Sequence, residues 1–98
     1  MGASTTNLFG KETIHLALIA RALAHPARVF ILQYIRDNNR MVSCVELSSR
    51  LGLSPTTIHH HLGIMQDGGI VELNFAFQSY DVVFIPERIE QFSHFLQD

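Results

Sequence analysis

A pair of helix-start signals, separated by a single glycine turn, constrains the fold of this 98-residue chain more than any other feature. The first signal is Ser43 with Glu46 three residues later, which has the pattern of a capping box. It predicts a short helix from Cys44 to near Gly52, with its leucines facing inward. The glycine then ends that helix, because glycine readily adopts the left-handed conformation at a helix terminus.

The second signal is Ser54 followed by Pro55. Serine caps a helix with its hydroxyl, and proline fits the first helical turn because no intrahelical partner is needed for its missing N–H. This helix is expected to run to Asp67 and to stop at the glycine pair 68–69. A short helix, a tight turn and a second capped helix together predict a helix-turn-helix.

The segment 11–24 has a helical pattern and is almost entirely apolar. At 100° per residue, one face carries Ile14, Ala17 and Leu18, and another carries Leu16, Ile19, Ala20 and Leu23. A helix that is apolar on two sides is buried on two sides. A domain of this size covers one of them, so the other side predicts a partner chain.

The next helix is expected to run from Pro26 to Asp37, because the residue before a proline avoids the helical conformation. Two asparagines stop it. Its predicted core residues are Val29, Phe30, Leu32 and Ile35.

The residue composition of the sequence changes after residue 69. Residues 70–75 and 80–85 are rich in β-branched and aromatic side chains, which predicts two strands joined by the four-residue loop 76–79. A last helix is expected from Pro86 to about Leu96.

This order of elements predicts an α+β, mostly helical fold. It is a winged helix-turn-helix with four helices, a β-hairpin wing and a C-terminal helix. Residues 1–10 are expected to form a flexible tail, and residues 11–98 a single DNA-binding and dimerisation domain.

Several segments resemble the ArsR/SmtB-type winged helix-turn-helix regulators over residues 14–96. The segments that carry the resemblance are 22–29, 46–47, 51–54, 57–62 and 69–71. The resemblance implies a repressor that binds a palindromic DNA operator as a homodimer. The two copies are expected to pair through their first and last helices. The expected dimer interface comprises Leu16, Ile19, Leu23, Ile89, Phe92, Phe95 and Leu96.

The second helix of the helix-turn-helix has one apolar and one polar face. Ile58, His61, Leu62 and Met65 have the spacing of a core stripe. The remaining short polar side chains suit base edges in the major groove, and the predicted base contacts are Thr56, Thr57, His59 and His60. The predicted DNA backbone contacts are Ser54, Arg28, Arg40 and Arg50. The alternative is that this polar face is merely solvated.

No metal or other cofactor is expected. The consecutive histidines 59–61 point about 100° apart on a helix and cannot close on one ion, so His61 is read as a core histidine. Cys44 occupies the position between those at which metal-sensing relatives carry cysteines. It is interpreted as a small buried residue, with a thiol sensor as the alternative.

The predicted wing departs most from the resemblance, because residues 74–85 contain no basic residue and include Asp81. Charge is also divided along the chain. Residues 21–66 hold five arginines against two acids, whereas residues 67–98 hold one arginine against six acids. The formal net charge of −2 therefore conceals a basic helix-turn-helix. DNA binding is expected to be weaker and less salt-dependent than that of a relative with a basic wing.

The composition limits the remaining function classes. A single cysteine excludes internal disulfides and indicates a reducing, cytoplasmic location. No apolar run approaches the roughly 18 residues of a membrane span. The polar residues form no recognisable catalytic arrangement, so no enzyme is expected. The alternative function is a winged-helix module that binds a protein through the aromatic segment 75–77 and has lost DNA binding.

Overall fold

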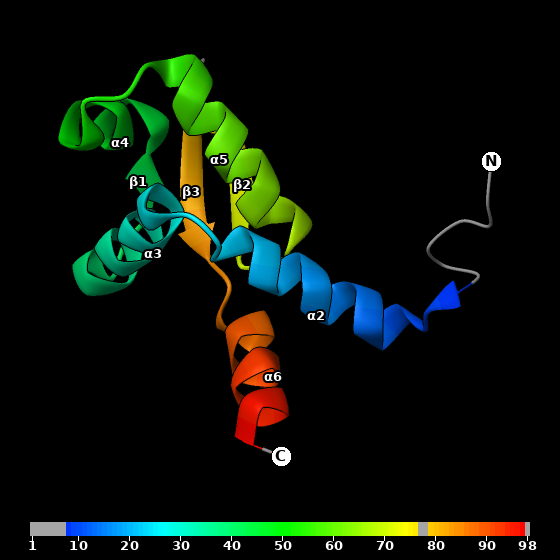
Figure 1. The fold of residues 1–98 in the computed structure, drawn as a ribbon. Coiled ribbons are helices and arrows are strands. Elements are labelled where there is room, and N and C mark those ends of the chain that lie inside the picture. The colour runs from blue at the N-terminus through cyan, green and yellow to red at the C-terminus, as the bar shows by residue number, and fades with distance from the viewer. Residues whose placement is uncertain (1–7, 77–78, 98) are drawn as a thin grey trace, which may run out of the picture.

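The computed structural model describes residues 8–76 and 79–97 (Figure 1). The elements are α2 (Lys11–Ala22), α3 (Pro26–Asn38), β1 (Val42–Ser43), α4 (Cys44–Leu51), α5 (Pro55–Asp67), β2 (Val71–Ala76), β3 (Ser79–Phe84) and α6 (Pro86–Gln97). The predicted order of four helices, a hairpin and a final helix is confirmed. Figure 1 shows α5 lying along the hairpin and α6 following the C-terminal end of β3.

Both predicted caps of the helix-turn-helix are present. The Ser43 hydroxyl accepts a hydrogen bond from the Glu46 N–H at 3.0 Å, and the Ser54 hydroxyl accepts one from the Thr57 N–H at 3.2 Å. Gly52 ends α4 with a φ of 68°, a conformation that costs glycine little. The turn between α4 and α5 is thus set by local sequence, as predicted.

Only half of the predicted capping box forms. The Glu46 carboxylate does not return to Ser43. Instead it accepts hydrogen bonds from Arg40 at 2.7 and 3.0 Å and a short one from the Tyr34 hydroxyl. Arg40 holds the pKa of Glu46 down to about 2, with the Tyr34 hydrogen bond contributing. Glu46 therefore joins α4 to the end of α3.

The sheet has three antiparallel strands in the order β1-β3-β2. Val42 pairs with Val82, which adds a strand that the sequence analysis did not predict. In the hairpin, Leu73 pairs with Val82 and Ala76 with Ser79. The predicted four-residue loop was therefore too long, because the ladder continues to residues 76 and 79.

The core lies between the sheet and the helices. Its buried members are Ile19, Ala22, Ile31, Ile35, Val42, Cys44, Leu47, Ile58, Leu62, Met65, Ile70, Val71 and Val82. The prediction that Val29 and Phe30 belong to the core was wrong, because they are 37% and 42% exposed. The inward stripe of α3 is instead the one that carries Ile31 and Ile35.

No single helix in the described ranges is long and apolar enough to cross a membrane. Only α2 and α3 taken together meet the length and composition criteria, and they are bent by 91°.

Candidate nucleic-acid interface

The recognition helix α5 separates its two faces as the periodicity predicts. Ile58, Leu62 and Met65 are fully buried, and His61 is buried with them. Thr56, His59 and His60 are exposed on the outer side. These three side chains are therefore free to meet a ligand that approaches α5.

Hydroxyl groups gather at the start of α5. The Ser54 hydroxyl donates to the Thr57 hydroxyl at 3.0 Å, while it also accepts the Thr57 N–H. Thr57 is half-buried, so it is presented less fully than Thr56. A helix N-terminus carries a partial positive charge, which favours phosphate at this end of α5.

The wing contacts the recognition helix through aromatic rings. The His59 and Tyr80 ring centroids lie 5.2 Å apart with an interplanar angle of 79°, an edge-to-face arrangement. Phe75 packs against Tyr80 from the neighbouring strand, with centroids 5.0 Å apart. The sequence analysis considered the wing for its missing basic residues and for the aromatic segment 75–77 as a protein-binding surface, and it did not predict this contact. The aromatic residues at 75 and 80 were the available signal.

Arg28 does not lie where a phosphate contact requires it. The residue is only 7% exposed, and its Nη2 donates to the Arg21 carbonyl at 3.0 Å. Its Nη1 lies 3.0 Å from Nδ1 of His61. The prediction that Arg28 contacts the DNA backbone was wrong, because this arginine is committed to joining α2, α3 and α5.

His61 is the core histidine that the sequence predicts. A guanidinium only donates hydrogen bonds, so Nδ1 of His61 must accept, which leaves the ring neutral with its proton on Nε2. Burial lowers the pKa of His61, and the neighbouring His25, Arg28 and His60 lower it further. The His25 ring centroid lies 4.5 Å from that of His61.

The other two arginines that were predicted to contact the DNA backbone, Arg40 and Arg50, differ in whether their charge is already paired. Arg40 binds the Glu46 carboxylate and the Met41 carbonyl, so its charge is already balanced. Arg50 is exposed at the end of α4, with its guanidinium carbon 5.3 Å from the Tyr34 ring centroid. Of the two, Arg50 offers the more available charge.

Cys44 fits the interpretation of a small buried residue. It is buried in the core, and burial raises the pKa of its thiol, with a smaller contribution from Asp81. The thiol is therefore less reactive than that of a solvent-exposed cysteine, which argues against the alternative of a thiol sensor.

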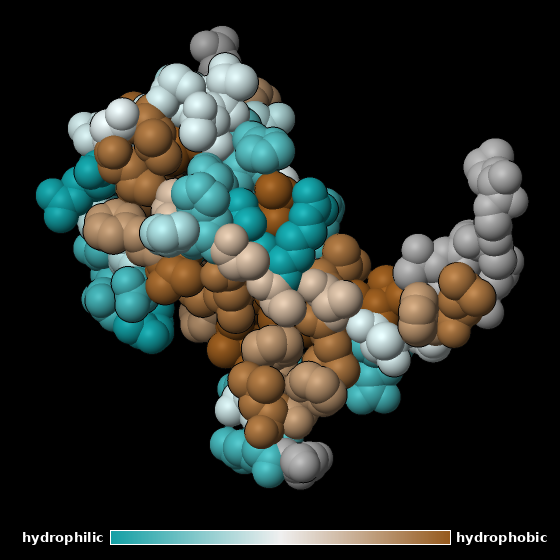
Figure 2. All heavy atoms as spheres, viewed as in Figure 1, coloured by the Kyte–Doolittle hydropathy of each residue, from teal (hydrophilic) through white to brown (hydrophobic). Residues whose placement is uncertain are grey.

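An apolar groove lies between α2 and α6, and we call it the α2–α6 groove. It has a volume of about 320 Å³ and is lined by Thr13, Leu16, Ala17, Ala20, Phe92 and Phe95. Figure 2 shows hydrophobic side chains gathered over α6 and along its junction with α2. Phe95 and Leu96 are exposed, as a partner-facing surface requires.

One member of the predicted dimer interface lies elsewhere. Ile19 is 0% exposed and packs in the core of its own chain, so its assignment to the interface was wrong. Ile89 and Phe92 are partly buried against the core. The face of α2 that remains open is the one carrying Leu16, Ala17 and Ala20.

A short helix, a glycine turn and a capped recognition helix, followed by an antiparallel hairpin, define the winged helix-turn-helix class of proteins. Solved structures share this fold. HlyU from Vibrio cholerae is 25% identical, with 91% of this chain and 95% of that chain covered and a TM-score of 0.71. An ArsR-like transcriptional regulator from Rhodococcus sp. RHA1 is 24% identical, with 87% and 78% covered and a TM-score of 0.73.

A third similar structure is the homodimeric winged helix-turn-helix DNA-binding domain of a possible ArsR-family regulator from Mycobacterium bovis. It is 20% identical, with 98% of this chain and 85% of that chain covered and a TM-score of 0.72. A comparison with curated protein sequences found no match. The sequence model described as a helix-turn-helix domain matches residues 23–74, more than half of the chain. The chain therefore belongs to this helix-turn-helix family, and its fold is the one found in ArsR-type transcriptional regulators.

Proposed function

We propose that this protein is a sequence-specific, DNA-binding transcriptional repressor that acts in the cytoplasm as a homodimer on a palindromic operator. The observation that carries the proposal is the exposure of Thr56, His59 and His60 on one face of α5, next to the N-terminal cap of that helix. Short polar side chains at the start of a recognition helix are what the major groove accommodates.

Each side chain has a chemical role in this proposal. Thr56 offers a hydroxyl to a base edge and a methyl group to thymine, and His60 donates to guanine. Thr57 supports the start of α5. His59 lies between the major groove of the DNA and the ring of Tyr80 in the wing. Ser54 and Arg50 contact the backbone phosphates. Arg28 is not proposed as a phosphate contact because it is buried. Arg40 is not proposed as one because it forms a salt bridge with Glu46.

The wing is proposed to contact DNA without a positive charge. Tyr80, which packs against Phe75, contacts His59 in the N-terminal half of α5, so the hairpin lies beside the part of the recognition helix that is proposed to enter the major groove. Aromatic rings and a phenolic hydroxyl contact sugars and groove edges without releasing counterions. The affinity then depends less steeply on salt than that of a protein with several lysine or arginine contacts.

Dimerisation is proposed through the α2–α6 groove, because an exposed apolar surface of this kind is stabilised by burial against a second copy. The homodimeric state of the domain from Mycobacterium bovis supports this assignment. A two-fold dimer places its recognition helices in successive major grooves about 34 Å apart, which requires a palindromic site.

The experiment is a fluorescence anisotropy titration of duplex DNA from upstream of the protein's own coding sequence, at several salt concentrations. A random duplex of equal length is the control. Tighter binding to the upstream duplex at each salt concentration supports the proposal. Equal affinity for both duplexes at low salt overturns it.

A second candidate function is a protein-interaction module that uses the wing. The observation that favours it is Phe75, which is 63% exposed on β2. Phe77, the other aromatic residue of the predicted surface, lies outside the described residues. The variant Phe75→Ala distinguishes the two functions. Loss of a co-purifying protein partner with unchanged DNA affinity supports the interaction module, whereas weaker DNA binding supports the repressor.

A further inference from the structure

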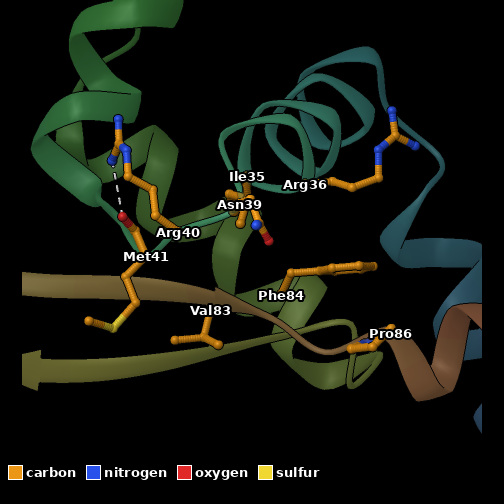
Figure 3. Close-up of a pocket in the computed structure, with 8 residues that line it drawn as sticks. All are labelled: Ile35, Arg36, Asn39, Arg40, Met41, Val83, Phe84 and Pro86. Carbon is orange, nitrogen blue, oxygen red and sulfur yellow. Dashed lines mark hydrogen bonds between the residues drawn. The ribbon is translucent and has the colours of Figure 1, made fainter.

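A second pocket lies away from both the recognition helix and the α2–α6 groove, and we call it the α3–β3 pocket. It has a volume of about 440 Å³ and is lined by Ile35, Arg36, Asn39, Arg40, Met41, Val83, Phe84 and Pro86. Figure 3 shows that these residues come from the end of α3, the segment before β1, the end of β3 and the start of α6, with the guanidinium groups of Arg36 and Arg40 pointing away from the other side chains. The volume lies within the range of pockets that bind small molecules.

The floor of the pocket is apolar. Ile35 is buried, and Val83 and Phe84 are half-buried on β3. In Figure 3 the Phe84 side chain extends beneath Asn39, whose amide points toward it. Asn39 has a φ of 50°, so the left-handed end of α3 sets the position of that amide. The pocket thus combines an apolar surface of ring size with one amide group.

The rim of the pocket carries two arginines, each of which pairs with an acidic residue that does not line the pocket. Arg36 and Arg40 flank it, and none of its eight lining residues is acidic. Arg40 is bound to Glu46. Among the residues that the structure describes, Arg36 pairs only with its neighbour Asp37 at 3.1 Å, on a surface where both side chains are mostly exposed. Exposed pairs of this kind contribute little free energy. Arg36 is therefore able to turn from Asp37 toward an anion in the pocket.

We propose that the α3–β3 pocket binds a small, ring-bearing carboxylate, with its ring against Phe84 and Val83 and its carboxylate on Arg36 and the Asn39 amide. Charge complementarity at the rim and the apolar floor select this ligand class over neutral or cationic molecules. The role of this carboxylate as an effector of DNA binding rests on the proposed function, whereas its binding to the α3–β3 pocket does not.

The strand β3 links this pocket to the DNA-binding surface. Val83 and Phe84 lie at one end of the strand, and Tyr80, which contacts His59, lies toward its other end. Pro86, also in the pocket, begins α6, which forms one side of the α2–α6 groove. A ligand that shifts the end of β3 therefore acts on the wing contact and on the dimer helix together, and we expect it to lower DNA affinity.

The binding test is a titration of the ¹⁵N-labelled protein with 1-naphthoate, followed by amide chemical shifts, with the neutral 1-naphthamide as the control ligand. Saturable shifts at Asn39, Met41, Val83 and Phe84 that are much weaker with the amide support the proposal. Saturable shifts confined to Thr13, Leu16 and Phe92 in the α2–α6 groove, or shifts that never saturate, overturn it.

Two variants sharpen the test. Arg36→Gln is expected to weaken naphthoate binding about tenfold, because one charged hydrogen bond is lost. The matched control Arg21→Gln, an exposed arginine on α2, is expected to leave it unchanged. Equal effects of the two substitutions overturn the role of Arg36. Val83→Trp fills the pocket and is expected to abolish binding, and if that variant does not fold, the comparison of the two glutamine variants decides.

The effector role is tested separately, by measuring DNA affinity with and without saturating naphthoate. A decrease in wild-type affinity that Arg36→Gln reduces supports coupling. An unchanged affinity, with naphthoate bound, overturns the coupling but not the site. Because DNA binding by the ligand-free protein tests the proposed function, the two failures are distinguishable.

Discussion

Nη1 of Arg28 in α3 lies 3.0 Å from Nδ1 of His61 in α5. This hydrogen bond fixes the recognition helix on α3, and Nη2 of the same arginine extends the connection to the carbonyl of Arg21 at the end of α2. The bond exists only while Nδ1 of His61 carries no proton, because a guanidinium has no acceptor. The helix that is proposed to read DNA is thus held by a pH-sensitive contact.

The fold is expected to lose stability in mild acid through His61. Its pKa is lowered in the folded state, chiefly by burial, so the unfolded chain takes up the proton first. The contribution is therefore fully present above the unfolded value of about 6.5 and is lost as the pH falls below it. Urea unfolding at about pH 7.5 and about pH 5.5 measures the loss.

His61→Asn is the matched variant for this prediction, since its amide oxygen takes the place of Nδ1 as an acceptor but does not titrate. The free energy of unfolding of this variant is expected to change less between the two pH values than that of the wild type. An identical pH dependence in both proteins would show that other groups cause the effect.

Arg28→Met is expected to destabilise the fold by about 1–3 kcal/mol, because it leaves the His61 acceptor buried without a donor and removes one of the two hydrogen bonds to the Arg21 carbonyl, which keeps the one from the Ala24 N–H. Arg21→Met removes an exposed side chain and is expected to change stability by less than about 0.5 kcal/mol. Urea unfolding compares the two variants. Equal stabilities, or a folded Arg28→Met protein with weakened DNA binding but normal stability, would restore Arg28 to the phosphate contacts.

A lysine in the wing is expected to steepen the salt dependence of DNA binding. Asn74 is exposed on β2 opposite Asp81, so we combine Asn74→Lys with Asp81→Asn to leave the new charge without a carboxylate. One added phosphate contact makes the slope of log affinity against log salt more negative by about 0.9. The control pair Gln97→Lys and Glu90→Gln on α6 changes the net charge equally. If the two double variants show the same slope of log affinity against log salt, the wing does not approach DNA.

Phe95→Asp is expected to prevent the proposed dimerisation and leave a monomer. Phe95 is 54% exposed and lines the α2–α6 groove, so burying a carboxylate there opposes association. Val45→Asp, which alters a more exposed apolar residue on α4, is the control and is expected to remain dimeric. Sedimentation equilibrium measures the mass. A dimeric Phe95→Asp protein would locate the interface elsewhere.

Local chemistry made much of the fold predictable. The hydroxyls of Ser43 and Ser54 and the glycine at 52 act on backbone groups a few residues away, so their positions in the sequence determine where α4 and α5 begin and end. The core face of α5 was equally predictable, because the stripe that includes Ile58 and Leu62 follows the helical period.

The features that sequence reasoning missed depend on contacts between distant segments. β1 is only two residues long and exists because Val42 meets Val82 across the sheet. Arg28 was predicted to contact the DNA backbone, yet it is buried and its guanidinium hydrogen-bonds His61, which lies 33 positions away in the sequence. The His59–Tyr80 contact likewise requires the hairpin to fold back onto α5, which no local pattern specifies.

The most direct test of the central claim is the affinity of the wild type and of a Thr56→Ala, His60→Ala double variant for a duplex obtained by selection from random DNA. Both substituted side chains are exposed, so the variant is expected to fold normally, as circular dichroism verifies. The account predicts that the wild type binds the selected duplex at least about 10³-fold more tightly than a scrambled one, and that the variant loses most of this preference. A wild type that binds both duplexes equally, or a variant that keeps the full preference, would contradict it.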